Sequence, residues 1–256
     1  MRMGRYQDVR PIEKITFVDA LNRYLEQISV TKRPNSENRD KQSSKIIVDY
    51  FGPEISLVEI SPQKVAAYRD YRMKKVAAST IQKEFALISH LFNVARREWG
   101  FPVDNPIPHI TRPKIRNNRT RFLTKEEAQR LLDAAKTSKN PKLYPYLLVM
   151  MHTGMRPSEA AGMKWGDIDL ENRLVKLQVT KTDMRYVPLI EVTENILRSI
   201  RPVDATNGMH VFLPPNSGES KQLVDVPCLH FKRSFMTARM KAGLEDLHLH
   251  DLRHTA

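Results

Sequence analysis

The sequence predicts a mainly α-helical protein with a small β-sheet, organised as two lobes joined by a basic tether. Over about the first hundred residues, apolar side chains recur at the three- and four-residue spacing of amphipathic helices. Prolines and unopposed cations interrupt that pattern between 105 and 121. Beyond the tether, helical spacing returns, and two short stretches near residues 174 and 186 have the composition typical of strands.

The first lobe is expected to contain four helices. Thr16 has the residue type and position of an N-cap for the first helix. A polar, turn-rich break at 31–40 separates it from a second helix at 41–51. Ser61, followed by proline, caps the third helix, and Ser79 caps the fourth. The apolar stripes of these helices predict the core of a small bundle, and they include Phe17, Leu21, Tyr24, Leu25, Ile28, Val65, Tyr68, Met73, Ile81, Phe85, Ile88, Leu91, Phe92 and Ala95.

The second lobe is expected to mix helices and strands. Thr124 and Glu127 have the spacing of a capping box, which opens its first helix. Helical spacing and β-rich stretches alternate after it. The predicted elements are a helix from 125 to 135, a helix over 144–152, strands over 174–179 and 186–190, helices over 191–201 and 229–242, and a further helix near His250.

A composition break between Asn105 and Arg121 separates the lobes. Its prolines restrict the backbone and its cations repel one another, which indicates an extended tether. We expect an N-terminal extension at 1–14, a helical domain at 15–108, a basic linker at 109–121 and a mixed α/β domain at 122–256. The cations of the linker have no acidic neighbours and indicate phosphate contacts; they are Arg112, Lys114, Arg116, Arg119 and Arg121.

The charge balance indicates a polyanionic partner. The 256 residues carry 42 Lys and Arg against 29 Asp and Glu, a formal net charge of +13. Residues 1–115 hold 20 basic and 13 acidic side chains, a net +7, and residues 116–256 hold 22 and 16, a net +6. Because both lobes are basic and a basic tether joins them, we expect a clamp around double-stranded DNA.

The composition excludes several classes of protein. Hydrophobic residues make up 41% of the chain, which is enough for a buried core and argues against disorder. A single cysteine excludes a disulfide scaffold and a cysteine-rich zinc module. No apolar run approaches the ~18 residues of a membrane span, and residues 1–15 lack the apolar segment of a secretory signal. We therefore expect a cytoplasmic protein without a membrane partner.

Three segments carry residues suited to chemistry on a phosphate ester. Residues 152–160 read His-Thr-Gly-Met-Arg-Pro-Ser-Glu-Ala, with Glu159 three residues after Arg156 on one helical face. Residues 180–189 place a lysine in the turn between the two predicted strands. Residues 248–255 read His-Leu-His-Asp-Leu-Arg-His-Thr. Each segment alone is a weak indication of function.

Taken together, the three segments resemble the boxes of the tyrosine recombinase family, also called phage integrases. The matching motifs are Gly154-x-Arg156-x-x-Glu159, Lys181 ahead of Val187-Pro188-Leu189, and His250-x-x-Arg253-His-Thr. Their order and separation agree with those of the family. The helical lobe, which ends at 92–106, resembles the core-binding domain of the same family. The resemblance therefore extends from about Ile15 to Ala256.

The resemblance implies a SAM-like, core-binding helical bundle followed by an integrase-type catalytic domain, here incomplete at its carboxyl end. It implies a site-specific recombinase that cuts and rejoins DNA through a 3′-phosphotyrosyl intermediate. Arg156 and Arg253 would hold the phosphoryl oxygens, because a guanidinium is planar, permanently charged and able to donate to two oxygens. Lys181 would protonate the leaving 5′-oxygen, and His250 would relay a proton and donate to the phosphate. Glu159 would orient these groups without touching the phosphate.

The nucleophile of the family has no match in this sequence. The nucleophilic tyrosine of the family follows the second box, whereas the tyrosines here all precede it, at positions 6, 24, 50, 68, 71, 144, 146 and 186. We therefore expect that the chain binds DNA but does not cleave it by itself. We also expect that its carboxyl end was either trimmed or lost by truncation of its gene. The resemblance further implies a bacterial or phage-encoded, nucleoid-associated protein. Full-length members of the family form tetramers on DNA, whereas a shortened chain can be a monomer.

Base contacts are expected from the helices near 61–75 and 79–97, with the candidates Arg69, Arg72, Thr80, Gln82 and Lys83. Lys64, on the first of these helices, is expected to contact DNA. A non-enzymatic DNA-binding remnant or regulator remains the main alternative. A metal-dependent nuclease or phosphatase needs clustered carboxylates, and only Asp167 and Asp169 stand near the first box. His250 and His254 have the spacing of a zinc site but lack the acidic residue of the metalloprotease motif. We expect neither a metal nor another cofactor.

Overall fold

The computed structural model describes residues 15–115, 121–177, 184–212 and 229–255. The chain divides into two compact units, Met1–Asn117 and Asn118–Ala256, which we call the N-terminal unit and the C-terminal unit. The described secondary structure consists of helices and one three-stranded sheet. The expectation of a mainly helical fold with a small sheet is therefore confirmed.

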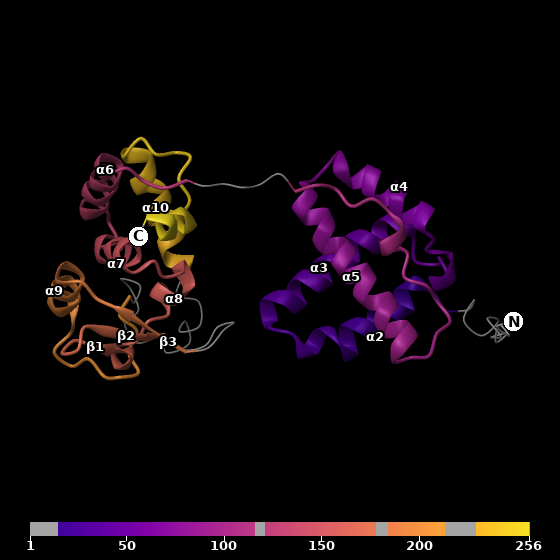
Figure 1. The fold of residues 1–256 in the computed structure, drawn as a ribbon, viewed down its shortest axis with the longest axis horizontal. Coiled ribbons are helices and arrows are strands. Elements are labelled where there is room, and N and C mark those ends of the chain that lie inside the picture. The colour runs from indigo at the N-terminus through magenta and orange to yellow at the C-terminus, as the bar shows by residue number, and fades with distance from the viewer. Residues whose placement is uncertain (1–14, 116–120, 178–183, 213–228, 256) are drawn as a thin grey trace, which may run out of the picture. The chain divides into compact units, whose positions relative to one another are not determined.

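The described part of the N-terminal unit is built from four α-helices. They are α2 (Phe17–Gln27), α3 (Pro34–Phe51), α4 (Pro62–Met73) and α5 (Ala78–Arg97), accompanied by 3-10 turns at Ser29–Thr31, Leu57–Glu59 and Ile107–His109. Helix α5 packs against α2, α3 and α4, and Figure 1 shows it running through the middle of this unit. The longest predicted stripe of the first lobe therefore becomes the centre of the bundle.

The predicted apolar stripes form the core of this unit, with two exceptions, Leu25 and Met73. Phe17 and Phe85 are fully buried, as expected. Met73, expected in the core, is instead 56% exposed. The buried face of α4 follows the positions i, i+3 and i+7, which fall on Val65, Tyr68 and Arg72. Helical phase therefore exposes the methionine and buries the arginine beside it.

Two helices begin at other residues than the sequence predicts. Helix α3 begins at Pro34 rather than at residue 41, because proline is favourable at the first helical position and the polar residues after it continue the helix. Helix α5 has Ala77 as its N-cap, where Ser79 was expected. The Ala77 carbonyl accepts the first hydrogen bonds of the helix, from the N–H groups of Thr80 and Ile81.

The C-terminal unit is built around α7 (Leu143–Thr153). Nearly every residue of α7 is buried, which explains its uniformly apolar sequence. Other helices pack against it, as Figure 1 shows. They are α6 (Lys125–Lys136), α8 (Pro157–Ala161), α9 (Glu191–Ile200), α10 (Leu229–Lys241) and α11 (Leu252–Thr255), with 3-10 turns at Trp165–Asp167 and Leu249–Asp251.

An antiparallel sheet in the order β1-β2-β3 completes the C-terminal unit. Strands β2 (Leu174–Leu177) and β3 (Arg185–Pro188) form the predicted hairpin. Strand β1 (Ile168–Asp169) is not predicted, because two residues are too few to show an alternating pattern. Asp169, which follows the first box, therefore belongs to a strand.

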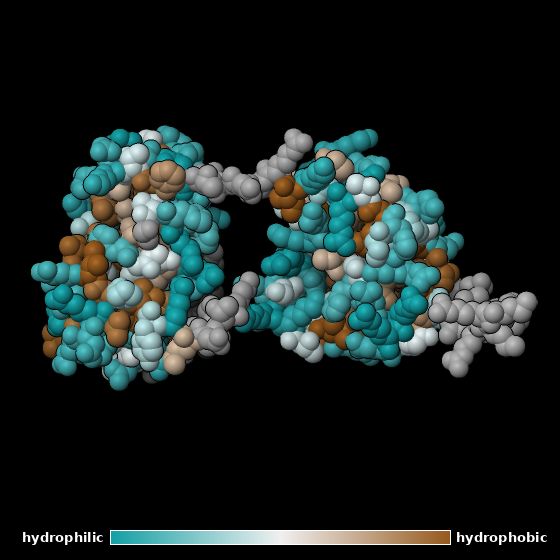
Figure 2. Space-filling view, viewed as in Figure 1, coloured by the Kyte–Doolittle hydropathy of each residue, from teal (hydrophilic) through white to brown (hydrophobic). Residues whose placement is uncertain are grey.

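The surface of each unit is mostly hydrophilic on the face that Figure 2 shows, with hydrophobic residues in small groups. Exposed apolar side chains include Phe122 and Met236. Among the described residues, no helix combines the length and the apolar composition that a bilayer crossing requires.

Candidate functional site

Arg156 stands in a short turn between two helices. Gly154 ends α7 in the left-handed conformation, with a φ of 60°, which favours glycine because a Cβ is strained there. Arg156 is the N-cap of α8, and Pro157 occupies the first helical position after it. The local sequence of the first box therefore determines where the Arg156 backbone turns.

Glu159 anchors this turn. Its carboxylate accepts hydrogen bonds from the backbone N–H of Arg156 at 2.7 Å and from Nη1 of the same residue at 2.7 Å. It also accepts one from Nη2 of Arg185 at 2.9 Å. The Glu159 side chain is 6% exposed, against 42% for Arg156 and 41% for Arg185. One nearly buried carboxylate therefore joins two half-exposed guanidiniums.

The electrostatics of this cluster keep Glu159 ionised. Burial acts to raise the pKa of Glu159, but the backbone N–H and guanidinium of Arg156 and the charge of Arg185 outweigh it. The pKa of the carboxyl consequently lies below its ordinary value. At neutral pH the cluster holds two positive charges and one negative charge.

Arg185 is a residue of this cluster that was not among the candidates predicted from the sequence. This residue begins β3 and pairs with Leu177 in the hairpin. Its contact with Glu159 joins residues 26 apart in the chain, which spacing does not reveal. The available signal was its charge, within a segment already chosen for its lysine. Lys181, in the same segment, lies outside the described residues.

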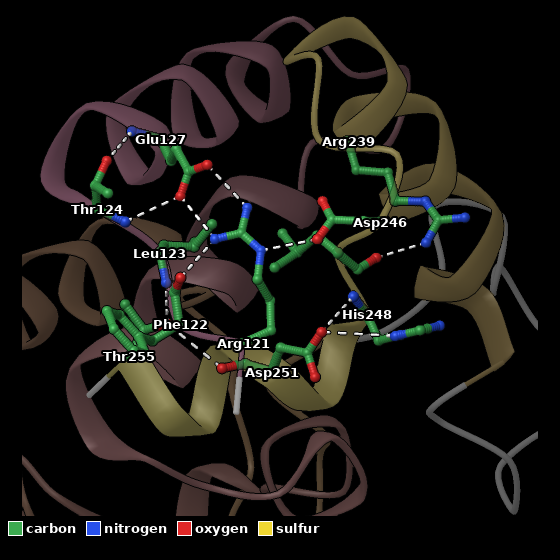
Figure 3. A network of polar contacts seen from close by, with 11 residues as sticks. Arg121, Phe122, Leu123, Thr124, Glu127, Arg239, Asp246, His248, Asp251 and Thr255 are labelled. Carbon is green, nitrogen blue, oxygen red and sulfur yellow. Dashed lines mark hydrogen bonds and ion pairs between the residues drawn. The ribbon is translucent and has the colours of Figure 1, made fainter. Parts of the chain in front are cut away.

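The second box lies on the turn Leu249–Asp251 and on α11. Asp251 is buried, and its carboxylate accepts the backbone N–H of His248 at 2.8 Å. Thr255 Oγ1 accepts the Leu123 N–H at 3.0 Å, so the box is tied to the first described residues of its unit (Figure 3). Arg253 has a buried Nη1 with no hydrogen-bond partner among the described residues. A buried donor without a partner is rare, and an anion would satisfy it.

The two boxes meet at a pocket of about 450 Å³. Pro157 of the first box and His250 of the second both line it, together with Phe235 and Met236 of α10. Since Pro157 directly follows Arg156, the boxes are neighbours in the folded unit. The rings of His250 and His254 stand edge to face, 5.9 Å apart. In the part of the chain that the structure describes, no group of three or more His, Cys, Asp or Glu is placed to hold a metal ion.

Arg121 is engaged by carboxylates rather than free, contrary to the expectation of a phosphate contact. Its Nη1 and Nη2 each donate to Glu127 at 2.8 Å, and its Nε donates to Asp246 at 2.9 Å. Figure 3 shows the guanidinium between the two acids. The expectation rested on neighbouring charges alone, whereas the fold brings Asp246, 125 residues away in the chain, to the guanidinium. Arg121 therefore anchors the end of the tether to the C-terminal unit.

Acidification is expected to destabilise the C-terminal unit through Glu127. The Arg121 guanidinium, and after it the Thr124 backbone N–H, lower the pKa of Glu127 to about 2. An unfolded chain has a Glu pKa of about 4.3, so the stabilisation is complete above that pH and is lost as the pH falls towards 2. Urea unfolding at about pH 5 and about pH 2.5 measures the loss, which should be larger in the wild type than in Glu127→Gln. Equal losses in the two proteins would contradict the assignment.

Arg72, expected to contact DNA, is buried in the N-terminal unit. Its Nη2 donates to Oε1 of Glu84 at 2.6 Å and its Nε to Oε2 at 3.1 Å. Tyr68 donates its hydroxyl to the same carboxylate at 2.8 Å. The arginine and glutamate side chains are 9% and 2% exposed. This burial contradicts a surface role, because the guanidinium is already neutralised inside the bundle.

Arg69 and Gln82 hold the first part of the tether. Arg69 donates from Nη1 to the Thr111 carbonyl at 2.9 Å, and Gln82 donates from Nε2 to the Pro113 carbonyl at 2.7 Å. Pro113 is buried. These two side chains, both of which were expected to contact bases, therefore fasten the tether to α4 and α5.

The remaining predicted DNA contacts fall into three groups. Lys64, Lys83, Arg112 and Lys114 are exposed on the N-terminal unit. Thr80 is partly buried in the first turn of α5. Arg116 and Arg119 lie outside the described residues.

Two family models match the chain. The model described as "Phage integrase family" matches residues 121–256, and the model described as "Phage integrase SAM-like domain" matches residues 16–112. A shufflon-specific DNA recombinase of Escherichia coli is 33% identical over 254 residues, which cover 96% of this chain and 62% of the relative. A putative integrase/recombinase of Haemophilus influenzae is 29% identical over 266 residues, which cover 99% of this chain and 68% of the relative. The chain thus spans less than two thirds of the length of the first relative.

Solved structures share the fold. The Tn1549 transposon integrase in complex with transposon right-end DNA superposes with a TM-score of 0.76 at 16% identity, over 94% of this chain and 85% of that one. A lambda integrase tetramer bound to a Holliday junction superposes with a TM-score of 0.74 at 19% identity, over 100% of this chain and 76% of that one.

Proposed function

Because the chain belongs to the phage integrase family of tyrosine recombinases, we propose that it supplies the DNA-binding and catalytic parts of a site-specific DNA recombinase. Residues 15–108 act as the core-binding domain, 109–121 as the linker and 122–256 as the catalytic domain. The residues matched by the two family models and the division of the chain near residue 117 support this arrangement. The partner is double-stranded DNA, on which the whole protein acts as a tetramer in the cytoplasm, at the nucleoid.

One observation carries the assignment of the site: the first and second boxes, each of which holds one arginine, meet at the pocket that Pro157 and His250 line. Glu159 binds one end of the Arg156 guanidinium, while Nη1 of Arg253 is buried without a partner among the described residues. A phosphorane transition state carries extra negative charge on its equatorial oxygens. Preorganised donors of this kind contribute roughly 3–4 kcal/mol each to stabilising such charge.

The remaining catalytic residues move protons. In the proposed reaction, a tyrosine oxygen attacks the phosphorus and the bond to the 5′-oxygen breaks. Lys181 gives its proton to that leaving oxygen, and His250 donates to the phosphate and relays a proton. Glu159 holds Arg156 in place and does not touch the phosphate.

Residues 1–256 contain no tyrosine after the second box. We therefore expect a polypeptide of these residues to bind duplex DNA without forming the phosphotyrosyl bond. The solved integrase–DNA complexes that share this fold support the binding part of the proposal.

Selection from a random duplex pool tests DNA binding. The chain is expected to enrich a defined sequence, and Arg253→Ala should weaken its binding by about tenfold, the cost of one charge-assisted contact. Arg198→Ala is the matched control, because this half-exposed arginine pairs with Glu194 elsewhere in the same unit. The control should change the Kd by less than about threefold. Failure to enrich any sequence would overturn the proposal.

A denaturing gel with the selected duplex, labelled on each strand, tests cleavage. No labelled DNA should remain attached to the polypeptide after treatment with SDS. An attached band would show that the chain supplies its own nucleophile. Nicking that EDTA abolishes would instead favour a metal-dependent nuclease over the proposed metal-free chemistry.

A further inference from the structure

Arg185 stands out among the cations of the C-terminal unit, because it shares a nearly buried carboxylate with an arginine of the proposed phosphate site. Arg156 alone with Glu159 would form a neutral pair. The Arg185 guanidinium, at 2.9 Å from Oε2 of the same carboxylate, restores one net positive charge to the cluster. Both guanidiniums remain about two fifths exposed, so the cluster can face an anion from solvent.

We propose that Arg185 is a positioning residue of the phosphate site, which shares the charge of Glu159 and so leaves Arg156 free to act on a DNA phosphate. The inference rests on the proposed function. Among the described residues, Glu159 Oε1 accepts a hydrogen bond only from Arg156, whereas Oε2 accepts from both the Arg156 backbone and Arg185. Removing Arg185 therefore leaves the carboxylate to a single guanidinium, which it neutralises and draws inward.

A second cluster in the same unit provides a matched comparison. Glu194 is also nearly buried and is bound by two half-exposed arginines, Arg173 and Arg198, at 2.8 Å each. No residue of the three motifs takes part in it. The same substitutions there change charge and burial equally but leave the proposed phosphate site untouched.

The test measures the Kd for the selected duplex in a charge cycle. Arg185→Gln makes the cluster neutral and should weaken binding by about tenfold. The double variant Glu159→Gln/Arg185→Gln restores one positive charge, so it should bind more tightly than Arg185→Gln alone. A merely structural role predicts the opposite order, because the double variant loses one more contact. Arg185→Lys keeps the charge and should stay within about threefold of the wild type.

The controls separate this inference from the proposed function. Arg198→Gln and Glu194→Gln/Arg198→Gln should each change the Kd by less than about threefold. If the wild type does not bind DNA, the proposed function is wrong. The role of Arg185 is wrong if the wild type binds DNA but Arg185→Gln has the same Kd. It is also wrong if the double variant binds no more tightly than Arg185→Gln alone. If Glu159→Gln prevents folding, the Kd of Arg185→Lys provides the test. Equal weakening of DNA binding by Arg185→Lys and Arg185→Gln would overturn the proposed role.

Discussion

Glu84→Ala should destabilise the N-terminal unit by about 3–5 kcal/mol, the usual cost of breaking a buried ion pair on one side. The substitution leaves the Arg72 guanidinium buried without its carboxylate and removes the acceptor of the Tyr68 hydroxyl. Burial, and after it the Glu84 carboxylate, hold the pKa of Tyr68 above its ordinary value, so this hydroxyl stays a donor. Native-state hydrogen exchange of α4 and α5 as a function of urea measures the loss within this unit.

An exposed ion pair of the same unit gives the control for Glu84→Ala. Arg96 and Asp104 pair at 2.8 Å on the surface. Asp104→Ala should cost at most about 1 kcal/mol, because solvent screens exposed pairs. A loss below about 1 kcal/mol for Glu84→Ala would contradict the burial of the pair.

DNA affinity should fall by about a thousandfold between roughly 50 and 200 mM salt. About six phosphate contacts produce a fall of that size, since each releases a counterion. The described cations that we propose to contact DNA are Lys64, Lys83, Arg112, Lys114, Arg156 and Arg253. Fluorescence anisotropy with the selected duplex at several salt concentrations gives the slope of log K against log salt.

Single substitutions refine the salt prediction. Lys64→Gln and Lys114→Gln should each reduce the slope by about one and weaken binding to all sequences alike. Lys41→Gln is the control, because Lys41 pairs with Glu37 on α3 and belongs to no predicted contact. An affinity that hardly changes over this salt range would count against the clamp.

The sequence was most informative where the cause of structure is local. The predicted N-cap at Thr16 and capping box at Thr124 are present, because a cap depends on residues three apart. The stripe on α5 predicts its buried face, since helical period alone determines which side chains share a face. Strand β1 and the early start of α3 were missed, because neither two residues nor a polar helix turn carries a periodic signal.

The sequence by itself determined the fold class, the two basic lobes and the three motifs that indicate the family. Only the tertiary structure decided which charges remain free. Arg72 and Arg121 looked like surface cations, yet packing places each against a carboxylate, Glu84 for the first and Glu127 for the second. Arg185 looked unremarkable, yet it reaches Glu159 from a different element. The physical reason is that hydrophobic period acts over a few residues, whereas an ion pair depends on distance in the folded chain, which spacing in sequence does not encode.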